Sequence, residues 1–161
     1  MTALWLMIFL ALAFLSFRGS RWAYGAFLVF AVGFIPARSG FALQPLVCET
    51  SMGLASAAYS LQNWKHVALC AVVASMTVAQ LRRLRTWAFF VAVLGTVSLG
   101  LVAELEQGLF RDGHCRMRDL VPDTVGAVLG AMAALAWSRR QATYSESDEV
   151  TEQAAEGVRP Q

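Results

Sequence analysis

Charged side chains and cysteines are scarce in this 161-residue chain. Only 15% of its residues are charged and 57% are hydrophobic, whereas soluble domains have about 25% charged residues. The three cysteines follow no metal-ligand or disulfide-framework spacing, and neither a His-x-x-x-His nor a Cys-x-x-Cys pair occurs. We therefore expect no zinc finger, no disulfide scaffold, no bound metal ion and no other cofactor.

Basic residues are few and lie mostly at the ends of apolar runs. The formal net charge is +2, with a single lysine among the basic residues, and they form no long basic stripe. We therefore expect no nucleic-acid partner. No basic residue precedes the first apolar run, so the positive segment that opens a signal peptide is missing. This favours a short first membrane helix there.

Apolar runs separated by arginine-bearing breaks predict an all-α membrane protein, a small bundle of five transmembrane helices. Pro36 is expected to end the second run, because proline has no backbone N–H and constrains the residue before it. The segment 51–62 fits either a short interfacial helix or an extended outer loop. The number of spans falls to four if the short first run does not cross the bilayer. The expected spans are residues 3–17, 22–35, 64–81, 86–103 and 121–137.

Arginine positions also predict the orientation. Arginines at 18, 21, 82, 83, 85, 139 and 140 fall on one side of five alternating helices, and the positive-inside rule makes that side the cytoplasm. Residues 1–138 would form one membrane domain, and the polar tail 139–161 would be disordered in the cytoplasm. Cys48 and Cys115 would both lie outside, where disulfides persist. Whether they are bridged stays open.

Polar residues interrupt the apolar pattern around the last loop. Glu104 and Gln107 are three residues apart and share a helical face. Asp119 and Asp123 are four apart and begin one stripe of the next helix. Because carboxylates inside an apolar helix are costly, they mark a functional site by default. We expect an outward-facing pocket, with Asp123 partly buried beside Glu104 or an arginine.

Other readings of these acids remain open. Asp119 can cap the last helix, and the glutamates can pair with Arg116 and Arg118. Arg116 is alternatively an anion contact for a phosphate or a carboxylate. His66, at the outer end of the third predicted span, is expected to line the pocket as a hydrogen-bonded residue.

Gly126 and Gly130 continue the aspartate stripe at Gly-x-x-x-Gly spacing. This spacing lets two helices approach closely. We expect packing within this bundle, with a homodimer interface as the alternative.

The stretch SLGLVAELEQ, followed by RDLVPDTVGAVLG, resembles the VanZ-like family of small bacterial membrane proteins, named for a teicoplanin-resistance protein. The family pattern is Glu-x-x-Gln at a helix end, a short loop with Arg or Asp, and Asp-x-x-x-Asn-x-x-Gly-x-x-x-Gly opening the last helix. The first glutamate and glutamine, the later aspartate and both glycines match. Asp123 replaces the usual asparagine, and Gly113 stands where many relatives have arginine.

The resemblance extends upstream and covers about residues 61–137. LQNWKHVALCAVVASM is similar to the family's Asp-Lys-x-x-His opening of an earlier span. His66 is the matching histidine, and Gln62 stands in place of the acid.

This resemblance implies a multi-pass protein of the bacterial cytoplasmic membrane that lowers susceptibility to teicoplanin-type glycopeptides. It would bind a lipid-linked cell-envelope precursor, a glycan headgroup or the glycopeptide itself. Two other functions stay open. One is a membrane hydrolase or transferase with Glu104 or Asp123 as general base, which no nucleophile motif accompanies. The other is a structural subunit of an envelope complex. The implied pocket comprises His66, Glu104, Gln107, Arg116, Asp119 and Asp123.

Overall fold

The chain is mostly helical in the computed structural model, which describes residues 2–39, 43–50, 53–81, 84, 86–110 and 115–156. A 3-10 turn (Met117–Asp119) leads into the last helix, and strand β1 (Cys48–Glu49) pairs in parallel with β2 (Cys115–Arg116). The prediction of a helical fold is confirmed, since helices make up most of the described residues. The helices are α1 (Thr2–Phe17), α2 (Arg21–Ser39), α3 (Leu54–Ser60), α4 (Trp64–Gln80), α5 (Thr86–Leu109) and α6 (Leu120–Glu156).

Five of these helices coincide with the five predicted apolar runs, but several ends differ. The prediction that Pro36 ends the second run is wrong, because α2 continues to Ser39. A proline removes only its own N–H, and so close to the end of the helix the loss of one hydrogen bond is tolerated. The segment 51–62 contains a helix, α3, rather than only an extended loop.

The last two helices are longer than predicted. α5 continues past residue 103 to Leu109, through leucine, glutamate and glutamine, which favour helices. α6 continues to Glu156, although the sequence predicted disorder from residue 139. No glycine or proline interrupts the chain between Gly130 and Gly157, so no residue in the tail forces the helix to stop.

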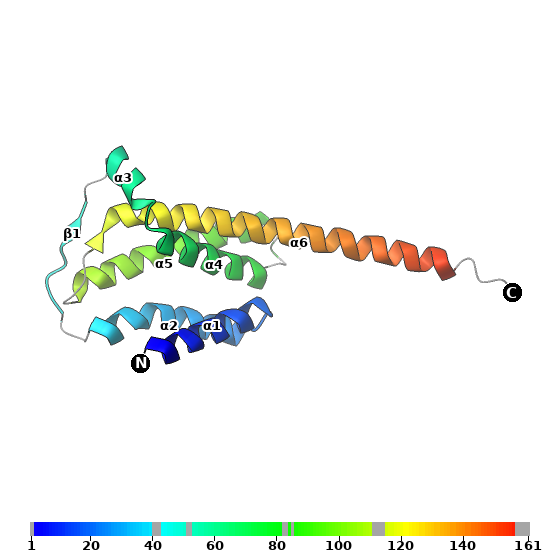
Figure 1. Cartoon of the computed structure of the whole chain (residues 1–161), viewed down its shortest axis with the longest axis horizontal. Coiled ribbons are helices and arrows are strands. Elements are labelled where there is room, and N and C mark those ends of the chain that lie inside the picture. The colour runs from blue at the N-terminus through cyan, green and yellow to red at the C-terminus, as the bar shows by residue number, and fades with distance from the viewer. Residues whose placement is uncertain are drawn as a thin grey trace.

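Two helical layers build the molecule (Figure 1). α4, α5 and α6 lie side by side, and the α1–α2 hairpin packs against them. Small side chains form the centre of the first group, including Ala74, Ala92 and Ala127. Phe27 packs with Val73 and Met76 between the two groups.

The two ends of the bundle differ in character (Figure 1). At one end, which we call the disulfide end, β1, β2 and α3 gather beside the start of α6. Cys48 and Cys115 are joined there by a disulfide, with their Cα atoms 4.5 Å apart. The backbone N–H of Gln44 donates to the carbonyl of Leu109 at 2.9 Å. This bond ties residues 43–49, which lead into and include β1 and which we call the strap, to α5. At the opposite end lie the α1–α2 turn and the α4–α5 connection, and α6 extends beyond them.

Large apolar side chains cover much of the outer surface. Trp22 is 91% exposed and Leu94 66% exposed, and many other large apolar residues are similarly open. Two described segments, Trp87–Leu109 and Met117–Gln141, are long and apolar enough to cross a membrane. Leu6–Phe17 and Arg21–Gly33 are shorter apolar helices. The number of spans, five or four, stays a prediction.

Candidate functional site

A histidine and an aspartate from two neighbouring helices meet near the disulfide end. His66 lies in the first turn of α4 and Asp123 in the first turn of α6, with 2.9 Å between His66 Nδ1 and Asp123 Oδ1. Asp123 is only 2% exposed, whereas the His66 side chain is 30% exposed. The thiol of Cys70, one turn along α4, lies 3.3 Å from the same carboxylate oxygen. The expected burial of Asp123 is observed, but its direct partner is His66 and not the predicted Glu104 or arginine.

Close approach of α4 and α6 makes this contact possible. A Cβ atom on Gly126 would lie 2.9 Å from the Cα of Val67, and one on Gly130 would lie 2.6 Å from the Cα of Ala71. The hydroxyl of Ser75 also donates to the Gly130 carbonyl at 2.9 Å. The glycine pair therefore faces α4 within the chain's own bundle.

A second carboxylate reaches the same place from α5. Glu104 is 1% exposed, and its Oε2 accepts the backbone N–H of Arg116 at 2.8 Å. One turn earlier, a Cβ on Gly100 would lie 3.1 Å from Cγ of Asp123. The bare backbone at Gly100 thus leaves room for the aspartate between α5 and α6.

Asp119 completes the group. His66, Glu104 and Asp119 each offer one atom that could bind a metal ion, a ring nitrogen or a carboxylate oxygen, and these three atoms lie within 4.8 Å of one another. We call His66, Glu104, Asp119 and Asp123 the histidine–carboxylate cluster. These four predicted site residues come from α4, α5, the 3-10 turn and α6, so three separate helices hold the site.

The two remaining predicted pocket residues take different places. Gln107 is half-buried on α5, and among the described residues no hydrogen bond joins its side chain to the cluster. The guanidinium group of Arg116 lies 4.0 Å from Glu49, and that of Arg118 lies 3.3 Å from it. Arg116 therefore meets Glu104 through its backbone, while its side chain faces the exposed strap. Gly113, Arg82, Arg83 and Arg85 lie outside the described residues.

The cluster brings three carboxyl groups and one imidazole together. Its two nearby arginines are engaged with Glu49 at the surface. The site thus offers hydrogen-bond acceptors and, where its acids are ionised, negative charge. Such a site suits hydroxyl groups or a cation. A phosphate group would instead be bound by the exposed arginines.

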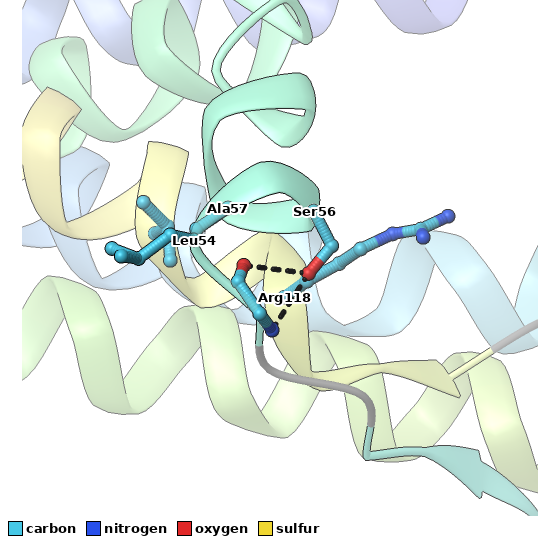
Figure 2. Close-up of a pocket in the computed structure, with 6 residues that line it drawn as sticks. Leu54, Ser56, Ala57 and Arg118 are labelled. Carbon is cyan, nitrogen blue, oxygen red and sulfur yellow. Dashed lines mark hydrogen bonds between the residues drawn. The ribbon is translucent and has the colours of Figure 1, made fainter.

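A shallow hollow lies between α3 and the start of α6 (Figure 2). It has a volume of ≈ 220 Å³ and shares no lining residue with the cluster. The hydroxyl of Ser60 donates to the Arg118 carbonyl at 3.0 Å and holds α3 beside it. The hollow is lined by Gly53, Leu54, Ser56, Ala57, Arg118 and Val121.

Sequence reasoning missed two residues that shape the cluster, Cys70 and Gly100. Each stands four residues from a predicted member, Cys70 after His66 and Gly100 before Glu104. That spacing places both on the faces already singled out, and it could have identified them.

No protein-family model, curated protein or solved structure matches this chain. The VanZ-like resemblance therefore stays a sequence-based hypothesis.

Proposed function

We propose that this protein is an integral membrane protein of the bacterial cytoplasmic membrane, with its disulfide end outside and its C-terminus in the cytoplasm. The long apolar helices and the exposed apolar surface support a membrane location. The disulfide supports the orientation, because disulfides persist in oxidising compartments. Arg18 and Arg21 lie around the turn at the opposite end, as the positive-inside rule requires.

At the disulfide end, the histidine–carboxylate cluster would bind a lipid-linked or glycan headgroup of the cell envelope. The observation that carries this proposal is that four polar side chains meet at the disulfide end of the bundle and that two of them, Glu104 and Asp123, are buried. Buried carboxylates in apolar helices are costly and by default mark a functional site. Glycan hydroxyl groups can donate to the carboxylates. A lipid-linked phosphate can meet Arg116 and Arg118, whose side chains are partly exposed beside the cluster.

By binding such a headgroup, or the glycopeptide itself, the protein would lower susceptibility to teicoplanin-type antibiotics, as the VanZ-like resemblance implies. The test is to compare teicoplanin and vancomycin inhibitory concentrations in a sensitive host. The host carries the wild type, Glu104→Gln, Glu106→Gln or an empty vector at matched membrane levels. Glu106 is the control, because it lies two residues from Glu104 on α5 and outside the cluster.

Selective teicoplanin tolerance with wild type and Glu106→Gln, and its loss with Glu104→Gln, is the expected result. Unchanged inhibitory concentrations with wild type would remove the proposed link to antibiotics. Equal tolerance with Glu104→Gln would remove the cluster from the function.

The contact between His66 and Asp123 favours a second candidate, an enzyme of acid–base type. Asp123 occupies Nδ1 of the imidazole, which leaves Nε2 as the atom able to accept a proton from a substrate. In this case His66 is the base and Asp123 orients it. The purified protein would be incubated with a lipid-linked disaccharide diphosphate. Turnover that His66→Gln abolishes would favour the enzyme, and saturable binding without turnover would favour the headgroup-binding function.

A further inference from the structure

We propose that, contrary to the expectation from the sequence, His66, Glu104 and Asp119 form a binding site for a divalent transition-metal ion, with Zn²⁺ as the test ion. One ligand atom from each side chain lies within 4.8 Å of the other two. This inference goes beyond headgroup binding and stands or falls independently of it.

The donor set matches the chemistry of such ions. Imidazole nitrogen and carboxylate oxygen are each ligands of zinc, at bond lengths of about 2.0–2.2 Å, and carboxylates also suit Mn²⁺. Three protein ligands leave a further position open for water or for a ligand oxygen. The three side chains come from α4, α5 and the 3-10 turn, so the ion would join three separate elements at the disulfide end.

Asp123 is placed to support a metal site, because it orients the histidine as carboxylates do behind metal-bound imidazoles. Its Oδ1 lies 2.9 Å from His66 Nδ1, which fixes the ring and leaves Nε2 to bind the ion. The Asp123 side chain is only 3% exposed, so solvent cannot replace this partner. Carboxylate–histidine–metal triads of this kind are typical of zinc sites.

Glu104 is also held in place for binding. It is 1% exposed, and the Arg116 backbone N–H fixes its Oε2 at 2.8 Å. Ligand atoms around zinc lie about 3.3 Å apart, so the three side chains must draw together by up to roughly 1.5 Å. Repulsion between neighbouring carboxylates opposes this approach, and a dication removes the repulsion.

The experiment measures metal binding by the whole purified protein, without a histidine tag, in detergent. The protein is stripped with EDTA, dialysed against Zn²⁺ or Mn²⁺, and assayed for bound metal by mass spectrometry and for affinity by calorimetry. We expect about one equivalent with wild type and Glu106→Gln. Binding should be lost with His66→Ala and Asp119→Asn, and weakened about 10–100-fold with Asp123→Asn, which disturbs only the orienting carboxylate.

Thermal unfolding of each variant, with and without metal, separates a lost ligand from a lost fold. Metal should raise the melting temperature of wild type but not that of a folded His66→Ala variant. Wild type without stoichiometric metal overturns the proposal, as does a His66→Ala variant that binds metal as wild type does. Only a metal ion is added in this experiment. A wild type that binds no metal would therefore not affect the antibiotic experiment, and a negative antibiotic experiment would not affect the metal-binding result.

Discussion

Replacing Gly130 by alanine should separate α4 from α6 and weaken both the bundle and the cluster. The new Cβ would lie 2.6 Å from the Cα of Ala71 and 2.7 Å from its carbonyl carbon. These are backbone atoms of a helix, so no flexible side chain can turn aside. Carbon atoms rest at about 3.5–4.0 Å from each other, so the two helices must move apart by roughly 1 Å.

The cost of this movement decides the sign of the change in stability. Overpacking a well-packed core costs about 1–3 kcal/mol, and alanine recovers about 1 kcal/mol of helix propensity over glycine. The net loss for Gly130→Ala is therefore about 0–2 kcal/mol. Gly95→Ala is the matched control, because Gly95 is exposed on α5 and nothing lies within 4 Å of the added Cβ. It should leave stability equal or raise it by up to about 1 kcal/mol.

The assay is thermal or denaturant unfolding of both variants in the same detergent, paired with the function of the cluster. A separation of roughly 1 Å would lengthen the His66–Asp123 contact beyond hydrogen-bond distance, so Gly130→Ala should also weaken the proposed metal binding. A Gly130→Ala variant as stable as Gly95→Ala would refute the reasoning. It would mean that α4 and α6 are not in backbone contact.

Three further predictions concern the disulfide, the topology and the buried aspartate. Replacing Cys48 and Cys115 together by serine should cost up to about 4 kcal/mol by the chain-entropy estimate for cysteines 67 residues apart. Thermal unfolding of the wild type with and without reductant checks this cost, and equal melting temperatures would contradict it. Alkaline phosphatase fused after residue 50 should be active, and green fluorescent protein at the C-terminus should fluoresce; the reverse pattern would invert the topology. Asp123→Ala should destabilise by about 1–3 kcal/mol, because it leaves His66 without its buried partner. Asp119→Ala, at a half-buried position, should cost less in the same unfolding assay.

The helices were predictable because each apolar run is continuous and ends in polar residues. Their ends were harder to predict. Pro36 was predicted to end α2, but the helix continues to Ser39, and α5 continues through Glu104 to Leu109. A helix end depends on which carbonyl and N–H groups find partners nearby, and here the strap at Gln44 supplies one for Leu109. That partner is distant in the sequence, so local propensity does not indicate it.

The members of the site were predictable from their chemistry, but their pairing was not. Acids in an apolar setting indicated Glu104 and Asp123, and helical spacing placed each on a face. That Asp123 meets His66 depends on the rotation and separation of α4 and α6, which Gly126 and Gly130 set through backbone contacts. Glu104 was expected to meet an arginine side chain, or Asp123, yet it accepts the Arg116 backbone N–H. No side-chain pattern predicts a backbone donor.

The disulfide also constrains how the protein is made. Cys48 is synthesised 67 residues before Cys115, which at about 5–20 residues per second is a delay of several seconds. Its thiol must wait while α3, α4 and α5 are synthesised, because α5 is the helix that returns the chain to the disulfide end. In the proposed topology, the bond can close only on chains whose α4–α5 hairpin has brought Cys115 to the same side of the membrane as Cys48. A closed disulfide would then be a chemical record of that insertion.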